Sequence, residues 1–63
     1  MKSGLQIALE EIERRQRGYE QQRDEEVAHG SYLNAAGWNG IAVGLMMAAN
    51  TIKAEIRHEE SAK

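Results

Sequence analysis

The sequence predicts an all-α protein, a helical hairpin that dimerises into a helical bundle. There is no proline and there are only three aromatic residues in 63 positions, which disfavours a β-sandwich or a barrel. Apolar residues recur at helical spacing in the charged first half, whereas no Asp, Glu, Lys or Arg stands between Ala28 and Ile52. So short a chain forms only a marginal core, and without cysteine it has no disulfide, so self-association is the expected source of further buried area.

The first helix is predicted over residues 4–22 of a single domain that covers residues 1–63. Ser3 and Gln6 have the spacing of a capping box. Acid-before-base pairs four residues apart, such as Glu10 with Arg14, favour the helix, and the same spacing joins Glu11 to Arg15 and Glu13 to Arg17. Its apolar seam steps by three and four residues and comprises Leu5, Leu9, Ile12 and Tyr19.

Gly18 interrupts this pattern, because glycine inside a helix costs about 1 kcal/mol relative to alanine. We therefore expect the helix to end near Gln22 and residues 23–32 to form an irregular connector. A short strand over residues 26–28 is an alternative within that connector. Ser31 and Asn34 are the N-cap candidates for the second helix.

The second helix is predicted over residues 33–58, with a frayed tail over residues 59–63. Two adjacent apolar stripes give it a face wide enough to contact both the first helix and a second subunit. Asn39-Gly40 is a hairpin signal and leaves a β-hairpin as an alternative, although Ala, Leu and Met around it prefer helices. The predicted dimer or partner interface comprises Leu33, Trp38, Ile41, Leu45, Met46, Met47, Ala49, Ile52 and Ile56.

The composition argues against several classes of function. With a net charge of −2 and interleaved acids and bases, nucleic-acid binding is not expected. The uncharged stretch holds too many polar residues to span a membrane, and no secretory signal is visible. Two histidines without cysteine match no zinc spacing, and the serines and glycines form no nucleophile or phosphate-binding motif. We expect no enzyme activity, catalytic residue, cofactor or metal.

Two alternatives remain open at this point. A metal- or nucleotide-dependent hydrolase would use Glu10, Glu13, Asp24 and Glu25, since carboxylates on paired helices can hold Mg²⁺. A DNA-binding regulator would rely on an arginine face that includes Arg14 and Arg17.

A set of short motifs between residues 13 and 38 resembles small proteins of temperate phages. They are Glu13-Arg14, Gln16, Gly18-Tyr19, Asp24-Glu25, Gly30, Leu33 and Ala35-Ala36. The chain departs from the phage pattern at Arg23, Glu25 and Ser31, which stand for a usual His, Asp and Glu. It is similar to the early-region open reading frames of lambdoid phages between the exonuclease and excisionase genes.

The resemblance implies a non-enzymatic accessory protein of the host cytoplasm, which promotes lytic development through contacts with an unidentified host or phage protein.

Overall fold

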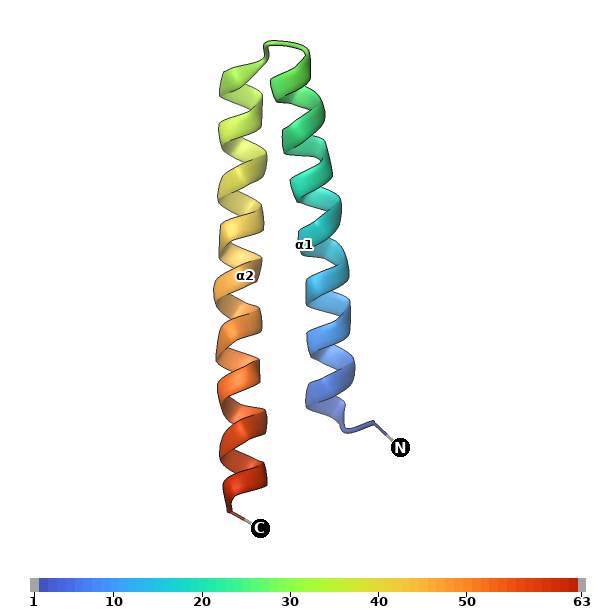
Figure 1. The fold of residues 1–63 in the computed structure, drawn as a ribbon, viewed down its shortest axis with the longest axis vertical. Coiled ribbons are helices and arrows are strands. Elements are labelled where there is room, and N and C mark those ends of the chain that lie inside the picture. Colours follow the sequence, from blue (N-terminus) through green and yellow to red (C-terminus); the bar gives the residue numbers. More distant parts are fainter. Residues whose placement is uncertain (1, 63) are drawn as a thin grey trace.

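The chain folds into two antiparallel helices joined by a tight connector, in a computed structural model that describes residues 2–62. Helix α1 spans Gly4–Ala28 and helix α2 spans Tyr32–Ser61, and they lie side by side with the two termini at the same end (Figure 1). The predicted helical hairpin is confirmed. The two strand alternatives are wrong, because residues 26–28 complete α1 and Asn39-Gly40 lies within α2.

The start of α1 is fixed by the predicted capping box. The Gln6 backbone N–H donates to the Ser3 hydroxyl oxygen at 3.2 Å, and the Ser3 N–H donates to the Gln6 side-chain carbonyl at 3.0 Å. Two N–H groups that the helix itself cannot satisfy are thereby paired.

Replacing Ser3 with alanine is expected to lower the free energy of unfolding by about 1 kcal/mol, because the N-cap acceptor is lost. Thermal melts followed by circular dichroism would measure the change. Ser61→Ala, at the last turn of α2 where no cap depends on a hydroxyl, is the matched control and should melt like the parent chain. Equal melts for both variants would show that the capping box contributes nothing.

The end of α1 lies at Ala28 and not near Gln22, so the predicted boundary is wrong. The helix continues through Gly18 and stops at a glycine-based C-terminal motif. Gly30 has φ 78°, its N–H donates to the Val27 carbonyl at 3.0 Å, and the Ser31 N–H donates to the Glu26 carbonyl at 2.8 Å. Only glycine adopts this left-handed conformation without a steric penalty, so Gly30 ends the helix.

The connector therefore comprises residues 29–31 in place of the predicted 23–32. Ser31 is the N-cap of α2, as one of the two candidates predicted, although its side chain makes no capping hydrogen bond. The predicted helix over residues 33–58 is present and extends into the predicted frayed tail as far as Ser61.

The two helices pack together along an alanine seam, a row of buried alanines that are spaced seven residues apart on α2. Ala35, Ala42 and Ala49 are 5%, 3% and 2% exposed, and no larger side chain in the described chain is buried to this extent. Such small side chains allow the helix axes to approach closely, and the seven-residue repeat keeps them facing the partner helix. On α1 one row of partly covered positions follows the same three- and four-residue steps: Leu5, Leu9, Ile12, Gln16, Tyr19, Arg23 and Glu26.

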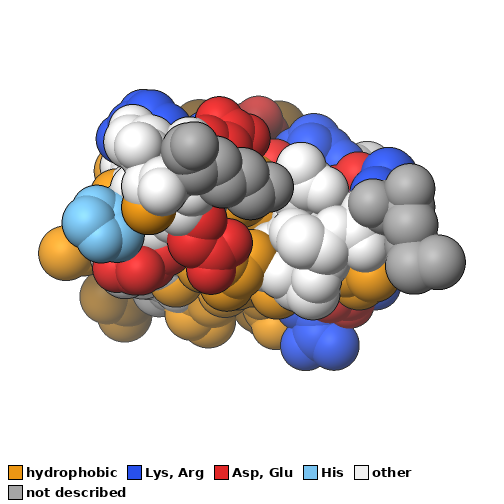
Figure 2. Space-filling view, turned by 90° about the horizontal axis from the view of Figure 1, so that it is seen from below, with side chains coloured by type: hydrophobic (Ala, Val, Ile, Leu, Met, Phe, Trp, Pro, Cys, Tyr) orange, Lys and Arg blue, Asp and Glu red, His pale blue; other side chains and the backbone are white. Residues whose placement is uncertain are grey.

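The hairpin is a flat slab one helix thick, because two helices have no third layer to enclose a core. Its Cα atoms extend over 50 × 19 × 11 Å. The view along the helices shows apolar side chains gathered mainly along the lower edge, with a few charged ones among them, and most charged side chains along the upper edge and the sides (Figure 2). One broad side of the slab is thus mostly apolar and the opposite side mostly charged.

Candidate functional site

The outer face of α2 carries apolar side chains that the hairpin itself does not cover. Steps of three and four residues place Leu33, Gly37, Gly40, Ile41, Gly44 and Met47 on one side of the helix, and these six residues define the outer face. Leu33 is 87% exposed and Met47 is 62% exposed. Exposed apolar patches of this kind mark interaction sites in proteins.

The three glycines of the outer face have no function within the hairpin. Their φ angles are negative, and a Cβ atom at Gly37, Gly40 or Gly44 would meet no neighbouring atom within 4 Å. Each glycine costs the helix about 1 kcal/mol relative to alanine. Since nothing inside the chain requires them, their effect is to flatten the surface so that another helix could approach closely.

The predicted interface residues fall into three groups in the structure. Leu33, Ile41, Met46 and Met47 are exposed. Four others are partly covered where α2 packs on α1, namely Trp38, Leu45, Ile52 and Ile56. Ala49 departs from the prediction, because it is buried within the hairpin and offers no surface to a second copy. The predicted seam residues Leu5, Leu9, Ile12 and Tyr19 are partly covered.

Polar contacts set the register of the two helices on the charged side of the slab. Arg23 donates from Nη1 to the Asn39 side-chain carbonyl at 2.8 Å, a part-buried hydrogen bond. Lys53 Nζ lies 3.3 Å from a Glu13 carboxylate oxygen. Glu13 therefore pairs across to α2 and not with Arg17 as predicted.

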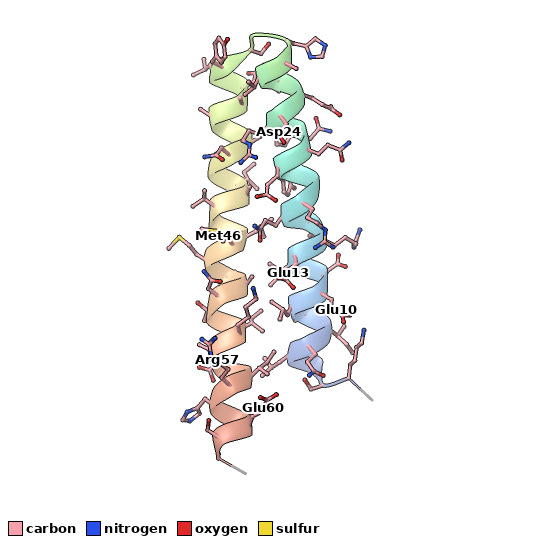
Figure 3. All side chains as sticks on the ribbon, in the orientation of Figure 1. Glu10, Glu13, Asp24, Met46, Arg57 and Glu60 are labelled. Atoms are coloured by element: carbon pink, nitrogen blue, oxygen red, sulfur yellow. The ribbon has the colours of Figure 1, made fainter. Side chains whose placement is uncertain are left out.

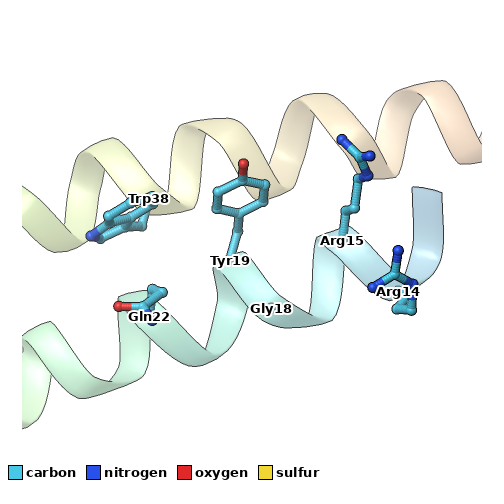
Figure 4. A pocket seen from close by; sticks show the side chains of 6 residues that line it. All are labelled: Arg14, Arg15, Gly18, Tyr19, Gln22 and Trp38. Atoms are coloured by element: carbon cyan, nitrogen blue, oxygen red, sulfur yellow. The ribbon is translucent and has the colours of Figure 1, made fainter. Parts of the chain in front are cut away.

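A hollow of about 650 Å³ opens on the flank where Trp38 of α2 meets α1. We name it the aromatic hollow, and its lining residues are Arg14, Arg15, Gly18, Tyr19, Gln22 and Trp38. Figure 4 shows Trp38 reaching from α2 while the other five residues come from α1. The Tyr19 and Trp38 rings are stacked, with centroids 5.6 Å apart and planes inclined by 23°.

One carboxylate holds both arginines at the edge of the aromatic hollow. Glu11 accepts from Arg14 through both oxygens and from Arg15 Nε at 2.9 Å. These hydrogen bonds from Arg14 and then Arg15 lower the pKa of Glu11 to about 2, and the bond to Glu11 raises the pKa of Arg14. The three side chains are therefore fully ionised at neutral pH, with a net charge of +1. The predicted Glu11–Arg15 pair is confirmed.

The acids of the hydrolase alternative do not converge on one point. Glu10 pairs with Lys2, Glu13 with Lys53 and Asp24 with Arg23, and Figure 3 shows them at different heights along α1. Within residues 2–62, no three His, Cys, Asp or Glu side chains lie close enough together to hold a metal ion. His29 instead caps α1, with Nδ1 2.7 Å from the Glu25 carbonyl oxygen.

The aromatic hollow was not predicted, because it is assembled from both helices. Gly18 was interpreted as a helix break, yet it lies mid-helix beside Tyr19 and forms the open floor of the hollow. A glycine next to an aromatic residue, followed by good helix formers, is the signal that could have located it.

Neither described helix is long and apolar enough to cross a membrane. No protein-family model, curated protein or solved structure matches the chain.

Proposed function

We propose that the chain is a non-enzymatic binding protein that forms a homodimer through the outer face of α2 and acts by contacting another protein. The observation that carries the proposal is the uncovered outer face, where exposed Leu33 and Met47 flank three glycines that the hairpin does not need. A second copy is the occupant that requires no further component, since a two-fold axis brings the same face of two subunits together.

The surface area supports the same occupant. The chain exposes 4774 Å², whereas compact folded proteins of 7.1 kDa expose roughly 4,100 Å². The excess, roughly 700 Å², is close to the ~800 Å² that each partner buries in a standard interface. Contact between the outer faces of two copies would cover part of this excess area and leave the flank between α1 and α2 open.

In biological terms, we propose an accessory protein of a temperate phage that promotes lytic development in the host cytoplasm. This part rests on the resemblance of the motifs around Gly18-Tyr19 and Ala35-Ala36 to phage early proteins. Producing the chain in host cells infected by a lambdoid phage should lower the frequency of lysogens, and an unchanged frequency would contradict it.

Sedimentation velocity tests the dimer directly. The parent chain should sediment as a dimer at micromolar concentration, and Leu33→Glu should sediment as a monomer because it places a charge in the interface. The Leu33 side chain is almost wholly in solvent in the single hairpin, so the helices themselves should still form. Ile7→Glu, at an exposed apolar position of α1, is the matched control and should remain dimeric. A dimeric Leu33→Glu variant would contradict the interface.

A further inference from the structure

The aromatic hollow combines the residue types from which protein-binding hot spots are made. Trp, Tyr and Arg are the side chains most enriched at such spots, because they offer a large rigid contact area together with a polar group. Tyr19 and Trp38 supply stacked rings, and Arg14 and Arg15 lie at their edge (Figure 4). The hollow lies on the flank between the helices and shares no residue with the outer face of α2.

The charge of the hollow favours an anionic ligand. Two guanidinium groups surround one carboxylate, and each arginine keeps N–H donors that Glu11 does not use. A planar guanidinium with donors to spare binds a second carboxylate well.

The floor of the hollow is a glycine that the helix does not require. Gly18 lies in the middle of α1, its φ is negative, and a Cβ atom there would meet nothing within 4 Å. Alanine would stabilise the helix at this position by about 1 kcal/mol. The effect of the glycine is to leave space beside the Tyr19 ring.

We propose that the aromatic hollow binds a short segment of a partner protein in which an aromatic or large aliphatic side chain stands beside a carboxylate. The apolar side chain packs on the rings of Tyr19 and Trp38, and the carboxylate pairs with Arg14 and Arg15. The inference rests on the proposed function, because it names the chemistry of the protein that the hairpin would contact.

A peptide suits this hollow better than a nucleic acid. A single strand needs a basic groove that follows several phosphates, whereas the hollow has only two arginines, next to each other on α1. Glu11 lies between them, and Glu10 and Glu13 occupy neighbouring positions on α1.

Fluorescence titration of Trp38 tests the proposal, because it is the single tryptophan of the chain and lines the hollow. The probe is the acetylated and amidated peptide DDFDDL, at low ionic strength. Trp38 emission should shift to shorter wavelength and saturate, since the bound phenylalanine removes water from the indole. The peptides NNFNNL and DDADDA, which lack the charge and the apolar side chains respectively, should give no saturable shift.

Removing the competing carboxylate should strengthen binding. In Glu11→Gln both guanidinium groups are free to pair with the peptide. The affinity for DDFDDL should therefore increase about two- to fivefold, the range of an exposed ion pair. Glu10→Gln makes the same charge change outside the hollow and should leave the affinity within error.

Filling the floor should abolish binding without unfolding the chain. A Cβ atom at position 18 meets nothing within 4 Å and leucine raises helix propensity, so Gly18→Leu should raise the melting temperature while the saturable shift disappears. Arg15→Gln should lower the affinity for the peptide about two- to fivefold. Arg17 does not line the hollow, so Arg17→Gln should leave the affinity unchanged.

Several outcomes would overturn the proposal. They are no saturable response with DDFDDL, an unchanged affinity in both Gly18→Leu and Glu11→Gln, or an equal response to an eight-nucleotide thymidine strand. The Leu33→Glu variant separates this result from the dimer, because Leu33 lies outside the hollow and the monomer should still bind the peptide. If the chain proves to be a monomer, the proposal of peptide binding is unaffected. If the peptide does not bind, the proposal of the homodimer is unaffected.

Discussion

Replacing Ala42 with leucine is expected to lower the free energy of unfolding of the hairpin by a large fraction and to lower its melting temperature. Ala42 is 3% exposed, at the middle of the alanine seam where the two helices meet. A larger side chain at this point forces the helices apart over several turns, and overpacking of this kind costs about 1–3 kcal/mol. Because a core this small rarely supplies more than 3–5 kcal/mol, the loss is a large fraction of the total.

Circular dichroism at 222 nm measures the outcome as a lower helix signal and a lower melting temperature. Ala54→Leu is the matched control, since it makes the same replacement at an exposed position of α2 and should melt like the parent chain. If Ala42→Leu melts like this control, then close approach at the seam does not stabilise the hairpin.

The helices themselves could be predicted from the sequence because each buries a stripe at helical spacing. Leu5, Leu9 and Ile12 follow that spacing, and the Ser3–Gln6 capping box is a local signal that needs no tertiary information. The end of α1 could not be placed by the same means. Gly18 has a local cost that packing against α2 offsets, whereas Gly30 ends the helix through its positive φ.

The side-chain contacts between α1 and α2 could not be predicted from the spacing of residues in the sequence. Glu13 has an arginine four residues ahead, yet it pairs with Lys53 because the hairpin brings α2 within reach. Asn39, which only the alternative β-hairpin would place in a turn, lies within α2 and accepts a hydrogen bond from Arg23 of α1. Spacing along one helix predicts neighbours on that helix only, and the partner across the seam depends on the register.

The candidate surfaces were predicted in part. The wide apolar face of α2 is visible in the sequence, but spacing does not say which of its stripes α1 covers. Ala49 was assigned to the interface and proves to be buried inside the hairpin, because the smallest side chains permit the closest approach. Leu33 and Met47 remain on the outside. The aromatic hollow requires Trp38 to lie against Tyr19, which no single helix reveals.

The double replacement Gly40→Leu with Gly44→Leu is expected to stabilise the single hairpin and to destroy the dimer. Leucine forms helices better than glycine by somewhat less than 1 kcal/mol per position, and a Cβ atom at either position meets no atom of the chain within 4 Å. On the outer face, however, the two side chains fill the flat surface that a second helix needs for close approach. Stability and association should therefore change in opposite directions, which a simple loss of folding could not produce.

Two measurements made over a range of protein concentrations separate these effects. The melting temperature of the parent chain should rise with concentration because dimerisation stabilises the folded state by mass action. The double variant should sediment as a monomer, melt at the same temperature at every concentration, and melt above the parent in dilute solution. Gly18→Ala, which adds helix propensity on α1 away from the outer face, should raise stability and leave the dimer intact. A double variant that retains the concentration dependence of the parent chain would show that the glycines of α2 face solvent in the assembly, and the dimer would then have to form elsewhere on the slab.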